Sequence, residues 1–334
     1  MANITLAHGN GGQLMHELIK KKILGSYGNP ILNRLSDAAI LELEKRRIAF
    51  TTDSFVVKPV IFKGGDIGKL AVCGTVNDLA VSGALPLYIS CSLIIEEGMP
   101  EELLMRFMAS MKKEAVVAGV KVVTGDIKVV ERGSCDKIFI NTSGIGVVRY
   151  SHELSTKRIK PGDKVIINGT IADHGVAVML ARGDLGFSGG PKSDCASLNG
   201  LILTMCDKCS NVKFMRDPTR GGVAAVMNEI VEGAPFGMRL FEDRIPISKE
   251  TASCCEILGI EPLQIGNEGK VIAIVGPRDA GKALRIMKRS PLGRRAAIIG
   301  EVTKDFKGKV VLQTKVGGER IVEMPVLEAL PRIC

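Results

Sequence analysis

A polar segment without hydrophobic periodicity interrupts the chain near its middle, at residues 149–162. It ends in the turn sequence Pro161-Gly162-Asp163. On either side of this segment, short apolar runs typical of strands alternate with helical patterns and glycine-containing turns. A length of 334 residues also exceeds what one hydrophobic core usually supports. We therefore predict a mixed helix-and-strand (α+β) protein with an N-terminal domain at residues 1–155 and a C-terminal α/β domain at 156–323.

The same patterns predict individual elements within both domains. Apolar runs predict strands at residues 48–54, 87–95, 120–124, 137–148, 164–168, 270–275 and 296–302. Helical periodicity predicts helices at residues 67–80, 100–119, 197–207 and 223–231. Pro100 suits the first turn of the second of these helices, because a proline there gives up no hydrogen bond.

The last eleven residues, 324–334, form a predicted tail that ends in a cysteine. Pro325 and Pro331 remove two backbone donors and prevent a continuous helix, so we expect an extended and mobile arm. The ten residues before Cys334 could carry its sulfur on the order of 30 Å. A thiol on such a tether could be loaded at one place and processed at another. A frayed end with a chance cysteine is the alternative.

Composition limits the classes of partner. The net charge of +9 raises nucleic acid or acidic substrates as partners, but the basic clusters are short and no aromatic platform accompanies them. Nine cysteines without a charged and apolar leader favour a reducing cytosol. No run of eighteen apolar residues is present. We expect a cytoplasmic protein that binds neither nucleic acid nor membrane.

Three motifs resemble functional sites only partly. Residues 276–283 match a phosphate-binding G-x-x-x-x-G-K loop but lack the final Ser or Thr, so an ordinary turn before a helix is favoured. Cys206 and Cys209 have metal-ligand spacing without a second pair of ligands. His8 lies in a glycine-rich turn that could bind an anion, or it could be a polar surface residue.

A more specific signal is a set of separated acids next to turns. Asp53, Asp78 and Asp126 each lie where a strand or helix meets a Gly-, Ser- or Asn-containing segment. Lys128 and the pair Asn267-Glu268 add a cation and further oxygens. Mg²⁺ prefers carboxylates together with substrate phosphates, so this set predicts a magnesium–nucleotide site.

These residues carry a resemblance that covers essentially the whole chain. The matching motifs are His8-Gly9 with Gly11-Gly12, Thr52-Asp53-Ser54, Gly64-Gly65-Asp66-Ile67-Gly68-Lys69-Leu70, Gly74-Thr75 with Asn77-Asp78, Thr124-Gly125-Asp126 with Lys128-Val129-Val130, Arg216-Asp217 with Thr219-Arg220-Gly221-Gly222, Asn267-Glu268-Gly269 and Pro331-Arg332-Ile333-Cys334. The sequence resembles the HypE family of hydrogenase maturation proteins, within the superfamily of aminoimidazole ribonucleotide synthetase (PurM). Lys63, Ile127 and Gly266 depart from the family's usual residues. Ile127 replaces a threonine beside Asp126 and so removes a hydroxyl there.

The resemblance implies a two-domain PurM-like fold. Its N-terminal strands would form a barrel across a homodimer interface, with ATP near that interface. The residues implied for ATP are Asp53, Asn77, Asp78, Gly125, Asp126, Lys128 and Asn267. Those implied for Mg²⁺ are Asp37, Asp53, Asp78 and Asp126.

The resemblance also implies a reaction at the terminal cysteine. Cys334 would receive a carbamoyl group from the carbamoyltransferase HypF, and ATP-dependent dehydration would convert it to a thiocyanate for transfer to iron on a HypC–HypD scaffold. Glu268 is the expected general base and His8 a second choice, while Lys128 would neutralise charge on the transferring phosphoryl group. Two alternatives stay open at this point: a related ATP enzyme that phosphorylates a small molecule, and a basic protein without catalytic activity.

Overall fold

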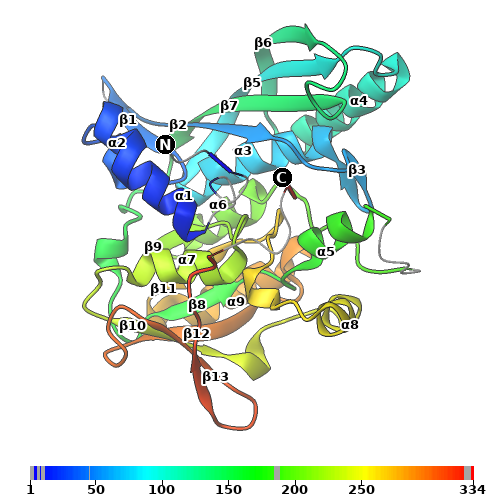
Figure 1. Ribbon diagram of the computed structural model, residues 1–334. Coiled ribbons are helices and arrows are strands. Elements are labelled where there is room, and N and C mark those ends of the chain that lie inside the picture. The colour runs from blue at the N-terminus through cyan, green and yellow to red at the C-terminus, as the bar shows by residue number, and fades with distance from the viewer. Residues whose placement is uncertain (1–3, 6–7, 9–11, 45, 184–188, 327–331) are drawn as a thin grey trace.

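The computed structural model describes residues 4–5, 8, 12–44, 46–183, 189–326 and 332–334. Its strands form two large sheets that lie one above the other, and helix α3 (Ile67–Val81) lies between them (Figure 1). A short hairpin, β3 (Ile61–Phe62) and β4 (Gly65–Asp66), leads directly into α3. The two-domain α+β prediction is therefore confirmed at the level of the fold.

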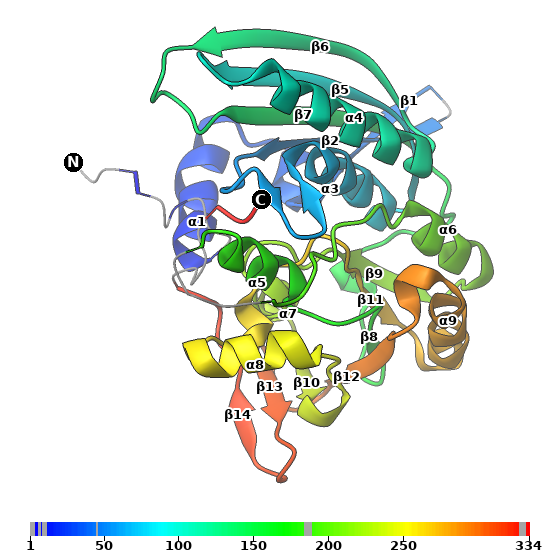
Figure 2. The ribbon, with the colours of Figure 1, turned by 90° about the vertical axis from the view of Figure 1, so that its right-hand side faces the viewer.

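The N-terminal sheet has the strand order β1-β2-β7-β5-β6, and only β5 and β6 run parallel. Its strands are β1 (Ala39–Leu43), β2 (Arg46–Phe55), β5 (Ala84–Glu96), β6 (Lys121–Val130) and β7 (Ile138–Val148). One face packs against α3 and α4 (Glu101–Ala118). Strand β6 lies at the edge of the sheet (Figure 2). Its residues are exposed along nearly its whole length.

Helix α3 is mostly apolar, which suits its position between the N-terminal sheet and the second domain. Almost all its residues are buried, and it contacts β2, β5 and β7 on one side and α6 and β9 on the other. Asp66 caps its first turn by accepting the backbone N–H of Lys69 at 3.0 Å. Gly74 allows close packing, since a Cβ there would lie 2.8 Å from the Phe55 ring.

The second sheet has the order β14-β13-β10-β12-β8-β11-β9, in which only β10 and β13 run parallel. Its strands are β8 (Lys164–Ile167), β9 (Val212–Arg216), β10 (Gly237–Phe241), β11 (Ile272–Val275), β12 (Ala297–Thr303), β13 (Val310–Gln313) and β14 (Glu319–Ile321). Neighbouring residues of its central strands point to opposite faces, so that Val165 and Ile274 join one core cluster and Ile166 and Ala273 another.

Helices cover both faces of this second sheet. Helices α5 (Asp173–Leu180) and α7 (Gly222–Val231) pack on one face, and α6 (Asn199–Lys208) and α9 (Pro277–Arg289) on the other. The remaining α-helices are α1 (Gln13–Leu18), α2 (Leu24–Tyr27) and α8 (Lys249–Leu258). Within the described residues, none of the helices combines the length and the apolar character needed to cross a bilayer.

Two of the partial motifs prove to be structural. Gly276 and Pro277 form the turn that starts α9 after strand β11, as the sequence favoured. Cys206 and Cys209 are both buried at the end of α6, and burial raises the pKa of Cys206 to about 12. A thiol with so high a pKa is protonated and unreactive at neutral pH.

Candidate functional site

Three carboxylates converge where the two domains meet. Asp37 precedes β1, Asp78 lies on α3, and Asp217 directly follows β9. One carboxylate oxygen from each residue lies within 4.8 Å of the other two. We call these three residues the acid cluster. Of the described residues, only these three form a group of acidic, histidine or cysteine side chains close enough to share one ion.

The acid cluster resists ionisation in the absence of a cation. Burial, and then the charges of Asp217, Asp37 and Asp53, hold the pKa of Asp78 well above its usual range. Burial and the neighbouring charge of Asp37 raise the pKa of Asp217 to about 8. The charge of Asp53 adds to the rise in pKa of both Asp78 and Asp217. The carboxylate of Asp53 lies against α3, where a Cβ on Gly74 would be 3.3 Å from Asp53 Oδ2.

Arg216 fixes one side of the acid cluster. Its guanidinium contacts Asp37 Oδ1 at 2.9 Å, also pairs with Glu229 on α7, and donates to the carbonyl oxygen of Leu35 at 2.8 Å. On the other side, Thr51 donates to Asp78 Oδ2 at 2.8 Å. The carboxylates are thus held in place by groups from both domains.

The residues present fit a magnesium ion. Three carboxylates that crowd one another form the oxygen-rich set that Mg²⁺ prefers. The structure brings together the predicted ligands Asp37 and Asp78, with Asp53 beside them. Asp217 appeared in the motif Arg216-Asp217 but was not among the predicted magnesium ligands, although its position at the end of a strand and before Thr219-Arg220-Gly221-Gly222 could have indicated this role.

The structure does not bring Asp126, Lys128 or Gly125 to this cluster within one chain. All three lie on the edge strand β6, three strands away from β2 in the sheet, which is roughly 14 Å at the usual strand spacing. The Asp126 side chain is 61% exposed and pairs with Lys128 Nζ at 2.7 Å. Asp126 therefore cannot share an ion with Asp53 of the same chain.

The two amide side chains that were predicted to bind ATP make hydrogen bonds within the protein. Asn77 accepts the N–H of Leu198 and donates to the carbonyl oxygens of Ala196 and Glu268, and in this way links α3 to the second domain. Asn267 accepts the N–H of Ala172 at 2.8 Å and donates to two nearby backbone carbonyls. Both amides are fully buried and hold the loops around the acid cluster in position.

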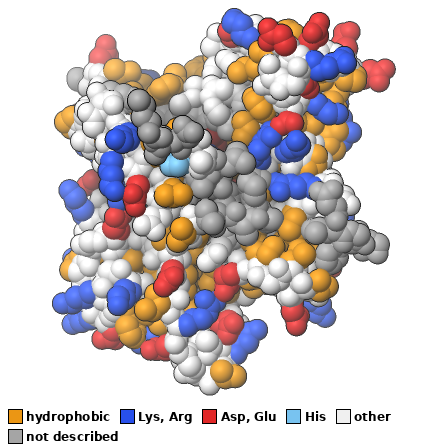
Figure 3. Space-filling view, in the orientation of Figure 1, with side chains coloured by type: hydrophobic (Ala, Val, Ile, Leu, Met, Phe, Trp, Pro, Cys, Tyr) orange, Lys and Arg blue, Asp and Glu red, His pale blue; other side chains and the backbone are white. Residues whose placement is uncertain are grey.

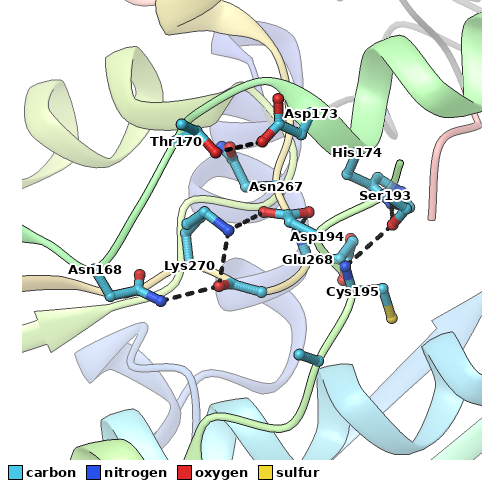
Figure 4. Close-up of polar contacts among 12 residues, drawn as sticks. Asn168, Thr170, Asp173, His174, Ser193, Asp194, Cys195, Asn267, Glu268 and Lys270 are labelled. Carbon is cyan, nitrogen blue, oxygen red and sulfur yellow. Dashed lines mark hydrogen bonds and ion pairs between the residues drawn. The ribbon is translucent and has the colours of Figure 1, made fainter. Parts of the chain in front are cut away.

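Glu268 is buried next to a charged pair that the sequence prediction missed. Its backbone N–H donates to Asp194 Oδ1 at 3.1 Å, and Asp194 in turn pairs with Lys270 Nζ at 2.8 Å (Figure 4). Burial, followed by the charges of Asp217, Asp53 and Asp194, raises the pKa of Glu268 well above its usual value. Glu268 therefore lies within the electrostatic range of the acid cluster.

The end of the chain is packed between the two domains, close to the loop of Glu268. Ile333 is buried, and a Cβ on Gly266 would lie 2.4 Å from its Cδ1 atom. Cys334 is 9% exposed, and its terminal oxygen accepts the N–H of Val56 at 3.1 Å. In Figure 1 the C-terminus lies between α3 and α5, and Figure 2 shows the same location from the side.

His8, the second candidate for a base, contacts Thr5 in the described structure. Its Nδ1 lies 3.0 Å from Thr5 Oγ1 and 3.2 Å from the Thr5 backbone nitrogen. These contacts do not connect it to Glu268 or to the acid cluster. Residues 9–11 of the same glycine-rich turn lie outside the described residues.

Comparison with known proteins agrees with this architecture. Residues 35–148 match the N-terminal domain model of "AIR synthase related protein", and residues 160–313 match the C-terminal domain model. "Carbamoyl dehydratase HypE" of Rhodobacter capsulatus is 46% identical over 334 residues, covering 99% of this chain and 98% of the relative. The chain belongs to the HypE family.

Solved structures of HypE proteins have the same fold. The chain described as "Crystal structure of HypE-HypF complex" superposes with a TM-score of 0.87 at 48% identity, covering 92% of this chain and 99% of that one. "Crystal Structure of Hydrogenase Maturation Protein HypE in complex with ATP" gives a TM-score of 0.83 at 43% identity, with 99% and 100% covered. The predicted membership of the HypE family and of its superfamily is confirmed.

The acid cluster predicts how Mg²⁺ affects stability at different pH values. Because the pKa of Asp217 is raised from 3.8 to about 8, its contribution to stability is complete below about pH 4 and is lost as the pH rises towards 8. Mg²⁺ should compensate for the charge that appears there. We expect the increase in Tm on adding Mg²⁺ to be larger at about pH 9 than at about pH 6. Thermal melts of the wild type and of Asp217→Asn test this.

Asp217→Asn should remove most of the pH dependence of that increase. The same increase in Tm at both pH values in the wild-type protein would contradict the assignment of the acid cluster as the magnesium site.

Proposed function

We propose that this protein is an ATP-dependent carbamoyl dehydratase, which converts an S-carbamoyl group on Cys334 into a thiocyanate and so supplies cyanide for iron in nickel–iron hydrogenases. Two relatives that are named carbamoyl dehydratase support this activity, and this chain aligns with nearly their full lengths. A HypE structure with bound ATP supports the nucleotide. The single observation that carries the proposal is the burial of Cys334 at the domain junction, beside the loop that bears Glu268.

The chemistry requires a phosphoryl donor. The carbonyl oxygen of the S-carbamoyl group attacks the terminal phosphorus of ATP, and ADP leaves. Two N–H protons are then lost, the C–O bond breaks, inorganic phosphate departs, and a C≡N bond remains on sulfur. An amide oxygen is a very poor leaving group, and conversion to a phosphate ester makes its departure feasible. The buried junction keeps water away from the activated group.

Glu268 is our proposed base for a proton of the carbamoyl nitrogen. A carboxylate in a buried, acid-rich setting is a stronger base than one in water, since its pKa is raised. Mg²⁺ in the acid cluster would screen the phosphates of ATP and stabilise negative charge on the transferring group. Asp37, Asp78 and Asp217 would hold the ion, with Asp53 beside them.

A homodimer would bring the residues of β6 into a nucleotide site. The edge strand exposes Val122, Ile127 and Val129, and Ile94 on the neighbouring strand is also exposed. A long exposed apolar edge favours pairing with a second sheet. We propose that two N-terminal sheets meet here as a barrel, so that Lys128 and Asp126 of each subunit reach ATP at the interface.

The proposed partners follow from the same reaction. HypF would supply the carbamoyl group, and the solved HypE–HypF complex supports this assignment. A HypC–HypD scaffold would accept the cyano group. Residues 327–331 of the tail lie outside the described residues, so the reach predicted for the tail stays a prediction.

Substitutions at Cys334 and Glu268 should separate loading from dehydration. With HypF, carbamoyl phosphate and ATP, the wild-type protein should gain one carbamoyl group and then lose one water, as measured by intact-protein mass spectrometry. Cys334→Ala should bind ATP normally but gain no carbamoyl group. Glu268→Gln should load normally but dehydrate about 100-fold more slowly, as expected for loss of a general base. Carbamoyl loading of Cys334→Ala, or a normal rate for Glu268→Gln, would contradict these roles.

Charges placed on the edge strand should prevent dimer formation. The double variant Ile127→Glu, Val129→Glu should sediment as a monomer, because two carboxylates on each edge would be buried without partners. Its affinity for ATP should fall by about tenfold or more if the nucleotide site needs both subunits. Val316→Glu, at an exposed turn between β13 and β14, is the matched control and should remain dimeric. A wild-type protein that is monomeric and still binds ATP tightly would contradict the proposed dimer.

A further inference from the structure

We propose that His174 is a positioning residue that latches the C-terminal peptide, so that the group on Cys334 is presented to Glu268 and ATP. This role rests on the proposed function. His174 is the second residue of α5 and is completely buried. Its Nε2 lies 2.7 Å from the carbonyl oxygen of Ile333, and its Nδ1 lies 2.8 Å from Ser193 Oγ. The imidazole thus joins the last peptide of the chain to the second domain.

The surroundings determine the tautomer of His174. A carbonyl oxygen can only accept, so Nε2 must carry the proton and donate to Ile333. Nδ1 then accepts the hydroxyl proton of Ser193, whose oxygen accepts the N–H of Cys195 at 3.1 Å. Burial lowers the pKa of His174, which favours this neutral form. The Phe62 ring lies edge-on to the imidazole at 5.3 Å and limits its rotation.

The opposite side of the terminal peptide is bound by the N-terminal domain. The N–H groups of Val56 and Lys58 donate to the oxygens of Cys334 and Arg332, each at 3.1 Å. Arg332 also donates to the carbonyl oxygen of Val56 at 3.0 Å and pairs with Asp136. The last three residues are therefore held from both domains. His174 supplies a hydrogen bond from the second domain, where Ile333 also packs against Gly266.

The latch and the proposed base share one short segment. Ser193 orients His174, and the next residue, Asp194, accepts the N–H of Glu268 and pairs with Lys270. Figure 4 shows Ser193 beside His174 and Asp194 beside Glu268. Ser193 is itself fixed to the N-terminal domain, because its N–H donates to the carbonyl oxygen of Lys63 at 2.8 Å. Moving the terminal peptide relative to Glu268 would break this chain of contacts.

A latch at this place has a direct chemical consequence. With the Ile333 carbonyl and the terminal oxygen of Cys334 both bound, the thiol can move only by rotation about its own side-chain bonds. Such restriction aligns the carbamoyl group for phosphorylation and raises the rate without any contact to the reacting atoms. The same burial hides the sulfur from a carbamoyltransferase, so the latch must open for loading.

The test uses full-length His174→Leu, which removes the donor, and His174→Gln, whose amide can replace the Nε2 donor. His152→Leu, at an exposed position, is the matched control. Protein loaded by HypF and carbamoyl phosphate is mixed with ATP and Mg²⁺, and water loss is followed in a single turnover. In parallel, alkylation of Cys334 by a bulky maleimide is compared by peptide mass spectrometry with that of Cys91, a half-buried free cysteine on β5.

We expect His174→Leu to slow dehydration by about tenfold or more at saturating ATP, with the half-saturating ATP concentration unchanged. Cys334 alkylation should rise by about tenfold relative to Cys91, and His174→Gln should stay within about threefold of the wild type on both measures. Ser193→Ala should change both measures in the same direction but by a smaller factor. It replaces His174→Leu as the test variant if His174→Leu does not fold. Wild-type rates in His174→Leu, or equal increases at Cys334 and Cys91, would overturn the latch.

A failure of the latch and a failure of the proposed function give different results. If the wild-type protein loads but never loses water, the dehydratase proposal fails. The alkylation ratio still decides whether His174 holds the terminus.

Discussion

The backbone of the C-terminal peptide is held by hydrogen bonds that come from both domains at once, from backbone N–H groups on one side and from a histidine side chain on the other. The N–H groups of Val56 and Lys58 bind it from the N-terminal domain, and the His174 side chain binds it from the second domain. Because neither domain alone supplies both sides, the position of Cys334 depends on how the domains are joined. Helix α3 and the buried amide of Asn77 provide that join, since both contact the two domains.

Burial of charge gives this junction its chemical character. Burial and mutual repulsion raise the pKa values of Asp78, Asp217 and Glu268, so these acids favour protonation when no cation is bound. By contrast, Asp194 keeps its charge: burial alone would raise its pKa, but the ammonium of Lys270 lowers it. Lys270 thus neutralises Asp194, whereas the acid cluster keeps raised pKa values at Asp78 and Asp217 although Arg216 pairs with Asp37, and this favours a divalent cation there.

Space-filling Figure 3 shows basic side chains scattered among acidic and apolar ones on the face it presents, without one continuous basic surface there. This agrees with the sequence, in which lysine and arginine occur in short clusters. The excess of positive charge is therefore spread over the surface visible in that view. The nucleotide site that we propose is built from acids and not from a basic groove, so the proposal requires binding through a divalent cation.

Local patterns predicted the elements well, because strand and helix periodicity depends on neighbours along the chain. The helix at α4 and the strand at β8 are close to their predicted bounds. Asp37 and Asp78 lie together in the acid cluster. The sequence pattern placed Asp217 in a motif without marking it as a ligand and did not indicate Asp194 or Lys270, because only the packing of separate loops of the second domain brings these three residues near Glu268. Within one chain Asp126 lies apart from the acid cluster, because β6 is an edge strand of the sheet, and which strand lies at a sheet edge cannot be read from the strand itself.

The most direct test of the central claim is the structure of the S-carbamoyl protein with Mg²⁺ and a non-hydrolysable ATP analogue. We predict that the Ile333 carbonyl stays on His174 Nε2, with the carbamoyl nitrogen facing Glu268 and its oxygen within about 3.5 Å of the terminal phosphorus. A terminus that leaves the junction in this state, or a terminal phosphate beyond reach of the carbamoyl oxygen in both subunits, would contradict the account.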